Sequence, residues 1–328
     1  MKAILNHIAE YKMLTRQQAH DVLMNIAQGK YNNSQVAAFL GCYTMRPAMV
    51  DELIGFQDAL LECCKKIDLS EFDCMDLVGT GGDCKNTFNI STLSTFVLAG
   101  AGIKVSKHGN YGVSSGCGSS NVLESLGYKF TSDQDELKRQ VDKAGICFLH
   151  APLFNPGMKA IAPFRKELGV KTFFNILGPL VNPSFPKNQM SGVFNLETLR
   201  LYNYIFQKSG KKFCVLYALD GYDEISLTGG CKLITNEGEK VVYPEDMGFR
   251  TLKPEEIAGG NTVEEAKEVF LNIISGKGTE AQRSVVLANS AWGIKTFYPE
   301  LSFEEAKAKA IESLDGGKAL EVLKKLVG

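Results

Sequence analysis

Residues 76–106 run DLVGTGGDCKNTFNISTLSTFVLAGAGIKVS and contain the parts of a βαβ unit. Asp76-Leu77-Val78 ends a predicted strand, and a glycine-rich turn follows it. Residues 91–102 have the apolar spacing of a helix, and Ile103–Ser106 form a second predicted strand. Strands joined by a crossover helix pair in parallel. The unit therefore predicts an α/β fold with a central, mainly parallel sheet flanked by helices.

The segment before this unit has helical patterns only. Its clearest start signal is the capping box formed by Thr15 and Gln18. Four short amphipathic helices are expected, and such helices need a partner surface to cover what they cannot bury alone. We predict a small helical domain over residues 1–68, to which a helical segment near 165–185 returns. Residues 73–328 are predicted to form the larger α/β domain.

Later segments predict the rest of that domain. Phe213–Ala218 is a predicted strand. Leu233–Thr235 and Val241–Tyr243 flank the turn sequence Asn236-Glu237-Gly238-Glu239, which predicts a hairpin. The C-terminal third is predicted to be helical because three capping-box patterns begin its apolar periods, namely Thr262 with Glu265, Thr279 with Gln282, and Ser302 with Glu305.

Composition excludes several classes of protein. The 328 residues carry 36 basic and 37 acidic side chains, so broad attraction to nucleic acid or a membrane surface is not expected. The chain has nine cysteines, which is an odd number, and no two of them form a C-x-x-C pair. This usage favours reduced thiols in a cytoplasmic protein. No run of 18 apolar residues predicts a membrane helix, and Met1–His7 has the pattern of a helix rather than of a signal peptide.

The turn Gly79-Thr80-Gly81-Gly82-Asp83 has the composition of an anion-binding loop. Glycine permits positive φ, and successive N–H groups can form a nest for an anion. The polar run Thr87–Thr92 then opens the predicted helix, where free N–H groups favour phosphate. The alternative is a structural turn with helix capping by Asn89 or Ser91. The turn matches neither the Walker loop nor the dinucleotide fingerprint, so it indicates neither ATP nor NAD.

A second loop of this kind follows the next predicted strand. Lys107-His108-Gly109-Asn110 offers a positive charge, and the run Ser114–Ser119 adds hydroxyl and backbone donors. A surface lysine and a structural histidine are the alternative. Ligands of open α/β sheets bind outside the carboxyl ends of the strands. Two such loops on adjacent strands predict a substrate with two phosphate groups.

Two further sites carry candidate binding groups. Asp223-Glu224 offers two hard carboxylates, and Mg²⁺ commonly takes one or two carboxylates plus substrate phosphates, although such pairs are common on surfaces. Arg165 lies near the end of a predicted helix and either stabilises that end or holds a carboxylate with its planar fork. Gly178-Pro179 would let the backbone approach an aromatic ring closely.

Four ordered segments resemble the anthranilate phosphoribosyltransferase family. They are GTGGDCKNTFNIST (79–92), KHGN with SSGCGSSNVLESLG (107–127), RKELGVKTFFNILGPLVNP (165–183) and DEISLTG (223–229). The likeness runs from the N-terminal helices to the last helix. It implies a magnesium-dependent transfer of the phosphoribosyl group from phosphoribosyl pyrophosphate to anthranilate, in tryptophan biosynthesis. It also implies the nucleoside phosphorylase and phosphoribosyltransferase fold class and a homodimer formed through the helical domain.

The resemblance further implies which residues bind the substrates and the metal. For phosphoribosyl pyrophosphate they are Gly79, Gly82, Asp83, Thr87, Asn89, Ile90, Ser91, Thr92, Lys107, His108, Gly109, Asn110, Ser114, Ser115 and Ser119. For anthranilate they are Gly79, Asn110, Arg165 and Gly178, and for Mg²⁺ they are Ser91, Asp223 and Glu224. His108 is also a candidate catalytic residue, with positioning of a substrate as the alternative.

Three positions depart from the family's pattern. Tyr111 stands where arginine is common, Asn121 where aspartate is common, and Cys84 where glycine is common. Losing the arginine and the acid together indicates either a lost salt bridge or a lost substrate contact. Two other functions remain as alternatives. One is a pyrimidine nucleoside phosphorylase, which would lack the context of Arg165. The other is a non-catalytic relative that binds nucleic acid, which needs clustered basic residues.

Overall fold

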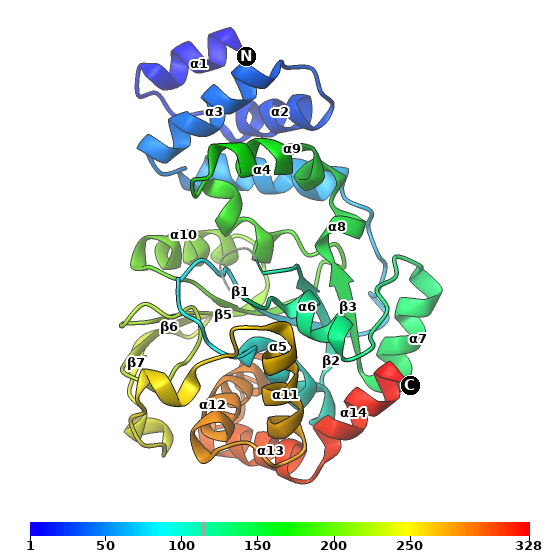
Figure 1. Cartoon of the computed structure of the whole chain (residues 1–328). Coiled ribbons are helices and arrows are strands. Elements are labelled where there is room, and N and C mark those ends of the chain that lie inside the picture. The colour runs from blue at the N-terminus through cyan, green and yellow to red at the C-terminus, as the bar shows by residue number, and fades with distance from the viewer. Residues whose placement is uncertain (113–115) are drawn as a thin grey trace. The chain divides into compact units, whose positions relative to one another are not determined.

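The computed structural model describes residues 1–112 and 116–328, and these divide into two compact units (Figure 1). The first unit joins Met1–Ile67 to Ala151–Pro183. The second joins Asp68–His150 to Ser184–Gly328. Each unit is therefore built from two segments that are separated in the sequence, and each has its own packing.

The first unit is helical throughout. Its elements are α1 (Lys2–Ala9), α2 (Arg16–Ala27), α3 (Asn33–Met45), α4 (Val50–Cys63), α8 (Ala151–Phe154), α9 (Pro156–Leu168) and two 3₁₀ turns, η1 (Phe173–Ile176) and η2 (Gly178–Leu180). Helix α2 packs on α4, and α9 packs on α2, α3 and α4. The capping box predicted for Thr15 and Gln18 is present at the start of α2. Helix α9 thus covers apolar surface that α1–α4 leave open.

A mixed seven-stranded sheet organises the second unit, in the order β3-β2-β1-β4-β5-β6-β7. The pairs among β1 to β5 are parallel, whereas the β5–β6 and β6–β7 pairs are antiparallel. The strands are β1 (Cys74–Gly79), β2 (Lys104–Gly109), β3 (Ile146–His150), β4 (Asn188–Gly192), β5 (Lys212–Ala218), β6 (Cys231–Thr235) and β7 (Gly238–Val242). The prediction of a helical domain with a larger, mainly parallel α/β domain is confirmed.

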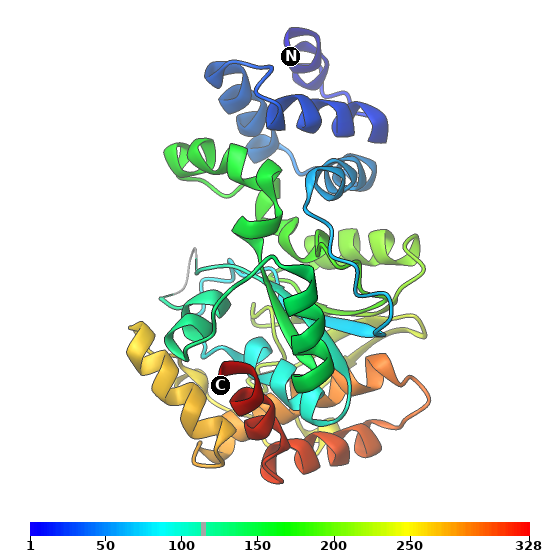
Figure 2. The same cartoon turned by 90° about the vertical axis from the view of Figure 1, so that its right-hand side faces the viewer.

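Helices cover both faces of this sheet. They are α5 (Ile90–Gly100), α6 (Ser119–Ser125), α7 (Gln134–Ala144), α10 (Leu196–Gln207), α11 (Val263–Ile274), α12 (Glu280–Phe297), α13 (Phe303–Asp315) and α14 (Lys318–Val327), with 3₁₀ turns η3 (Glu245–Met247) and η4 (Pro254–Ile257). Helices α12, α13 and α14 pack against α5 on one side, as Figures 1 and 2 show in orange and red, and α10 packs against β5.

The two faces of the sheet differ in polarity. Met75 and Leu77 of β1 join Phe96 of α5 and Ile294 of α12 in the hydrophobic core. The opposite face carries fully buried polar side chains, namely Asp76, Ser106, Gln189 and Ser191. Buried parallel strands are ordinarily apolar, so this second face is unusual.

Two predicted boundaries were wrong. Strand β2 runs on to Gly109, which pairs with His150 of β3, so Lys107 and His108 are buried strand residues rather than loop residues. The hairpin turn is shorter than predicted, because Thr235 already pairs with Gly238. Pairing with neighbouring strands extends β2 and β7 beyond the residues that their sequence patterns predicted.

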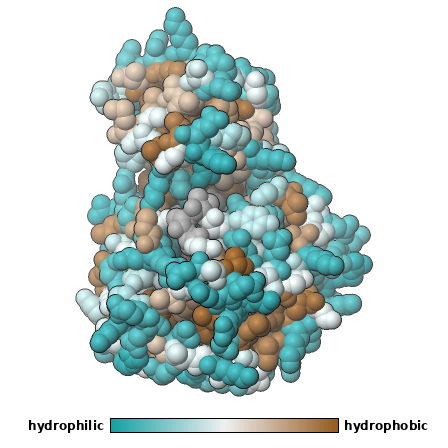
Figure 3. Space-filling view, in the orientation of Figure 1, coloured by the Kyte–Doolittle hydropathy of each residue, from teal (hydrophilic) through white to brown (hydrophobic). Residues whose placement is uncertain are grey.

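The described part of the chain has no helix long and apolar enough to cross a membrane. It includes all nine cysteines, and no disulfide joins any two of them. The face of the second unit shown in Figure 3 is mainly hydrophilic, with hydrophobic residues in several groups, most of them low on that face.

Candidate functional site

The acidic pair Asp223-Glu224 lies after β5, outside any helix or strand. The Asp223 carboxylate accepts a hydrogen bond from the Gly81 amide, with 2.6 Å between Gly81 N and Asp223 Oδ2. A Cβ at Gly79 would lie 2.4 Å from the same oxygen, so no other residue fits there without displacing the acid. The glycine-rich turn after β1 is therefore folded directly around Asp223.

Glu224 faces the start of helix α5. Its Oε1 accepts a hydrogen bond of 3.0 Å from the Ser91 amide. Its Oε2 is buried and has no hydrogen-bond partner among the residues that the structure describes. A buried carboxylate oxygen without a donor is costly, and a bound cation would satisfy it. The structure thus brings Ser91 against Glu224, next to Asp223, and these are the three residues that the family resemblance implies for magnesium.

Negative charge is crowded at this point. Burial raises the pKa of Asp223 to about 7, and the nearby Asp83 carboxylate adds to the shift. Burial also raises the pKa of Glu224 well above its ordinary value, and Asp223 raises it further. Burial raises the pKa of Asp83 as well. These carboxylates are therefore costly to ionise together unless a cation joins them.

The oxygen-only donor set suits a hard cation such as Mg²⁺. Within residues 1–112 and 116–328, however, no group of three or more His, Cys, Asp or Glu side chains is arranged to hold a metal ion unaided. Magnesium often takes only one or two protein carboxylates and completes its shell with water and substrate phosphate. The geometry fits a metal that needs a phosphorylated substrate.

Lys107 places a buried ammonium group close enough to interact with these acids. Only 2% of its surface is exposed. Its ammonium donates to the Leu77 carbonyl at 2.5 Å and to the Ser91 hydroxyl at 3.4 Å. Burial lowers the pKa of Lys107, while the carboxylates of Asp76, Glu224 and Asp223 oppose the shift. Lys107 therefore ties the end of β1 to the start of α5 and offsets part of the acidic charge.

The first glycine-rich loop has the backbone of an anion nest. Gly81 (φ 64°), Gly82 (φ 78°) and Cys84 (φ 59°) are all left-handed. Asp83 Oδ1 accepts from the Lys85 amide at 3.1 Å, which holds the turn. Left-handed residues in such a turn direct successive N–H groups to one side, as an anion site requires.

The polar run that follows is used differently from simple capping. Asn89 is the N-cap residue of α5 but makes no capping hydrogen bond with its side chain. It donates instead to the Cys117 carbonyl at 3.0 Å and so connects the two predicted phosphate loops. Thr87 pairs with Ala258 in an isolated bridge. Ile90 and Thr92 are buried, and Ile90 belongs to the hydrophobic core.

The second loop is closed by Asn121. Its Oδ1 accepts hydrogen bonds of 3.0 Å from both the Gly112 and the Gly118 amides. The Asn110 carbonyl accepts from the Ser119 hydroxyl at 3.2 Å. The predicted residues Ser114 and Ser115 lie outside the described residues. The described ends of this loop are therefore fixed by side chains of α6.

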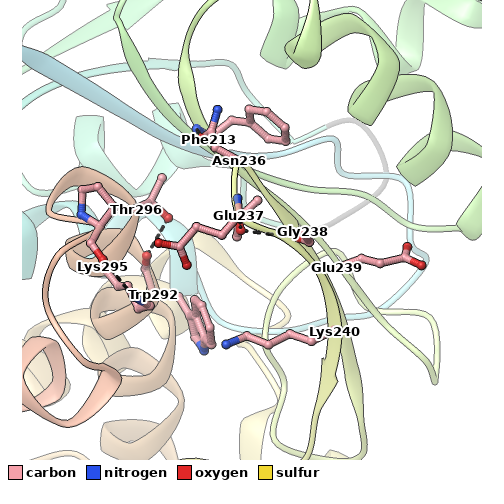
Figure 4. A pocket seen from close by; sticks show the side chains of 11 residues that line it. Phe213, Asn236, Glu237, Gly238, Glu239, Lys240, Trp292, Lys295 and Thr296 are labelled. Carbon is pink, nitrogen blue, oxygen red and sulfur yellow. Dashed lines mark hydrogen bonds between the residues drawn. The ribbon is translucent and has the colours of Figure 1, made fainter.

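A separate cavity lies elsewhere in the second unit. Its volume is about 270 Å³, and it opens between the β6–β7 hairpin and α12 (Figure 4). Lys240 reaches over the Trp292 ring there, with 4.6 Å between the ammonium and the ring centroid. None of the predicted substrate residues lines this cavity. It is therefore not the site that the sequence motifs describe.

Known proteins place these motifs in one family. Residues 71–320 match the glycosyl transferase family a/b domain, and residues 2–64 match the helical bundle domain of that family. An anthranilate phosphoribosyltransferase from Flavobacterium johnsoniae is 57% identical, with 99% of this chain and 98% of that protein covered. This chain belongs to the anthranilate phosphoribosyltransferase family.

Solved structures agree with that assignment. The anthranilate phosphoribosyltransferase of Thermus thermophilus superposes with a TM-score of 0.92 at 29% identity, covering 98% of each chain. The Saccharomyces cerevisiae enzyme, solved in complex with PRPP and Mg, gives a TM-score of 0.91 at 25% identity, covering 100% of this chain and 98% of that chain.

The structure explains how this anthranilate phosphoribosyltransferase family member accommodates two departures from the family's pattern. Asn121 needs only an oxygen to accept the Gly112 and Gly118 amides, and asparagine and aspartate both provide one. Tyr111 packs its ring edge-on to His150, with centroids 4.7 Å apart, and its hydroxyl lies 3.4 Å from Glu124. Neither residue needs the other as a charge partner here.

The residues that the family assigns to anthranilate divide between the units. Arg165 and Gly178 belong to the first unit, whereas Gly79 and Asn110 belong to the second. Burial lowers the pKa of Arg165, whose guanidinium lies 5.8 Å from the centroid of the Phe174 ring. A Cβ at Gly178 would meet no described atom within 4 Å, leaving aside those of its two chain neighbours.

His108 is buried at the end of β2, and its amide lies 3.4 Å from Asp76 Oδ1. Sequence reasoning missed two residues near the acidic pair. A Cβ at Gly192 would lie 1.5 Å from the Asp223 carbonyl oxygen, and Asn289 hydrogen-bonds to the backbone of Ile225. Neither residue belongs to a recognisable motif, so only the tertiary structure identifies them.

Cys84, the third departure from the family's pattern, is a position where glycine should stabilise the protein. Cys84 has φ 59°, a region that costs a side-chain-bearing residue about 1–2 kcal/mol. Glycine removes that cost but adds roughly 0.5–1 kcal/mol of backbone entropy. We expect Cys84→Gly to raise the free energy of unfolding by up to about 1 kcal/mol in urea denaturation. The same replacement at Cys42, inside α3, is expected to lower it by roughly 0.3–0.5 kcal/mol, the difference in helix propensity between the two residues. Equal losses at both positions would contradict the argument.

Proposed function

We propose that this chain transfers the 5-phosphoribosyl group from phosphoribosyl pyrophosphate to the amine of anthranilate in tryptophan biosynthesis. The observation that carries the proposal is the buried acidic pair Asp223-Glu224, held against the glycine-rich turn and the start of α5. Curated family members at 50–57% identity over the full chain carry this activity's name. The pair and the two loops supply oxygen ligands and N–H donors for a diphosphate.

The reaction is a substitution at the anomeric carbon of the ribose. The amine nitrogen of anthranilate forms the new bond, the bond to the pyrophosphate oxygen breaks, and the amine loses one proton. Because an aromatic amine is a weak nucleophile, stabilising the leaving group is the main catalytic task. The N–H groups of the Gly79–Asp83 turn and of the first turn of α5 are suited to binding that charge as it develops.

Ser91, Asp223 and Glu224 would hold Mg²⁺, which when bound neutralises charge on the pyrophosphate. The other residues proposed for phosphoribosyl pyrophosphate are those that the family pattern indicates, from Gly79 to Ser119. Lys107 acts within that set as the fixed charge between β1 and α5. This division of roles follows from the contacts of each side chain.

Anthranilate has a carboxylate and an aromatic ring to be positioned. We assign the carboxylate to Arg165, because burial has partly desolvated that side chain and a planar fork suits a carboxylate. Gly79, Asn110 and Gly178 would complete the contacts. Positioning two substrates supplies a large share of catalysis in reactions of this kind. His108 is the candidate proton acceptor, and positioning is its alternative role.

We also propose a homodimer formed through the first unit, in the cytoplasm. Large apolar side chains are exposed in that unit, with Tyr11 at 81% and Met45 at 88%. Packing against a second copy would remove the apolar surface of these side chains from water. The odd number and irregular spacing of the nine cysteines favour a reducing compartment.

The test mixes purified protein with anthranilate, phosphoribosyl pyrophosphate and Mg²⁺ and follows the loss of anthranilate fluorescence. We expect a loss that requires all three components. Omitting each component in turn is the control. Unchanged fluorescence in the complete mixture would reject the proposed acceptor, and phosphorolysis of pyrimidine nucleosides would then be measured.

A further inference from the structure

The backbone of the acidic pair has no regular secondary structure to hold it. Asp223 and Glu224 lie between β5 and β6, in a stretch of bends without ladder hydrogen bonds of its own. Carboxylates that must meet a metal ion need a fixed backbone, because a displacement of about 1 Å weakens both ligation and catalysis. Other parts of the second unit must therefore hold this stretch in place.

Asn289 of α12 provides one clamp. Its Oδ1 accepts from the Ile225 amide at 3.1 Å, and its Nδ2 donates to the Ile225 carbonyl at 2.9 Å. The same Nδ2 donates to the Val285 carbonyl, one turn earlier in α12, at 2.9 Å. Asn289 is 2% exposed and Ile225 is 1% exposed. The side chain thus pairs with both backbone groups of the residue that follows Glu224.

Gly192 limits movement of the same stretch next to Asp223. A Cβ at this position would lie 1.5 Å from the Asp223 carbonyl oxygen and 2.6 Å from its carbonyl carbon. The last residue of β4 is therefore in direct contact with the backbone of Asp223. The acidic pair lies between this contact and the Ile225 clamp, which leaves its backbone little freedom to shift.

We propose that Asn289 is a positioning residue for the acidic pair. By fixing Ile225, it directs the carboxylates of Asp223 and Glu224 and so sets the affinity of the enzyme for its divalent cation. The inference rests on the proposed function only in naming the cation. A side chain that merely filled the core would affect stability but not metal affinity, and this difference makes the idea testable.

The variants are Asn289→Ala and a matched control, Ser290→Ala. Ser290 is the next residue of α12, is fully buried, and has a hydroxyl without a hydrogen-bond partner among the described residues. Both changes truncate one buried polar side chain of the same helix. Asn289→Asp differs little in volume and keeps an acceptor for the Ile225 amide, but it loses the donor to the Ile225 and Val285 carbonyls.

Two measurements do not depend on turnover. Hydrogen–deuterium exchange of the metal-free protein reports the Ile225 amide in peptides spanning residues 219–228. Electron paramagnetic resonance measures Mn²⁺ binding in the presence of phosphoribosyl pyrophosphate. We expect Asn289→Ala to speed exchange in that segment and to weaken Mn²⁺ binding about 10- to 100-fold. Asn289→Asp, which breaks the contact with the Ile225 carbonyl, should weaken Mn²⁺ binding as well, and Ser290→Ala should match the wild type.

Kinetics separates positioning from general damage. For Asn289→Ala we expect a raised apparent KM for Mg²⁺ and a KM for anthranilate within about twofold of the wild type. Unchanged Mn²⁺ affinity in a folded Asn289→Ala or Asn289→Asp protein would overturn the proposal. If Asn289→Ala does not fold, Asn289→Asp decides alone. Weaker Mn²⁺ binding in a protein whose wild type shows no transfer would support Asn289 while rejecting the proposed function.

Discussion

Asp223→Asn and Glu224→Gln are each expected to lower kcat/KM about 10²- to 10³-fold. Each change keeps the shape of the side chain and removes its negative charge. The hydrogen bonds from the Gly81 and Ser91 amides can persist, because an amide oxygen accepts as a carboxylate does. The loss therefore reflects weaker stabilisation of the leaving pyrophosphate. The double variant should lose less than the product of the single losses, because the two acids act together.

Asp223→Asn is also expected to affect the thermal stability of the metal-free protein in a particular direction. Since the pKa of Asp223 is raised to about 7, ionising it in the folded, metal-free protein costs free energy. That cost grows as the pH rises from 3.8, the ordinary pKa of an aspartate, to about 7, the raised pKa of Asp223. Asp223→Asn removes it, so the metal-free variant should melt at the same temperature as the wild type or higher at pH 8.

Steady-state assays with titrated Mg²⁺, together with calorimetric melting, check both expectations. Glu239→Gln is the control, because it removes an exposed carboxylate of the same unit that pairs with Lys232. Its activity should equal that of the wild type. Full activity in either acidic-pair variant would remove these carboxylates from the mechanism, whereas a lowered melting temperature would attribute the loss to misfolding.

The sequence predicted the first βαβ unit because local signals there agree. Strand β1 and helix α5 have ordinary apolar patterns, and the glycine-rich turn between them marks where the strand ends. Strand β4, Asn188–Gly192, has the sequence NQMSG and no apolar alternation, so no pattern predicted it. Its polar residues can be buried because they have partners, since Gln189 donates to the Ser191 hydroxyl and accepts from Lys211, and these contacts depend on tertiary structure.

The candidate site divides in the same way. Asp223, Glu224 and the Gly79–Asp83 turn were predictable, because each belongs to a short motif whose composition indicates its chemistry. Gly192 and Asn289 were not, since they act on the backbone around those motifs from β4 and α12. A single asparagine inside a helix has no sequence signature that separates a backbone clamp from an ordinary core residue.

The first unit contains a buried carboxylate whose removal should strongly lower the free energy of unfolding. Glu52 of α4 is fully buried and accepts hydrogen bonds from the Leu14 and Met49 amides and the Tyr43 hydroxyl. Arg46 pairs with both of its oxygens, at 2.9 and 2.7 Å. Breaking a buried pair by removing one partner costs about 3–5 kcal/mol. We therefore expect Glu52→Ala to destabilise the first unit by about that amount.

The pH dependence of this effect follows from the same contacts. Burial alone would raise the pKa of Glu52, but the hydrogen bonds from Arg46, Met49 and Leu14 outweigh it, so the pKa lies below its ordinary value of 4.5. A depressed acid pKa adds stability above the unfolded value, and that stability is lost as pH falls through the folded value. The difference between wild type and Glu52→Gln should therefore shrink below about pH 4.5.

Hydrogen exchange resolves the two units, because peptides from α1–α4 report the first unit alone. We expect Glu52→Ala to speed exchange throughout those helices while strands β1–β5 keep the protection of the wild type. Asp51→Asn, which neutralises the exposed preceding acid of the same helix turn, should stay within about 0.5 kcal/mol of the wild type. Equal protection in Glu52→Ala and Asp51→Asn would mean that the buried pair adds nothing to stability, as happens when desolvation cancels attraction.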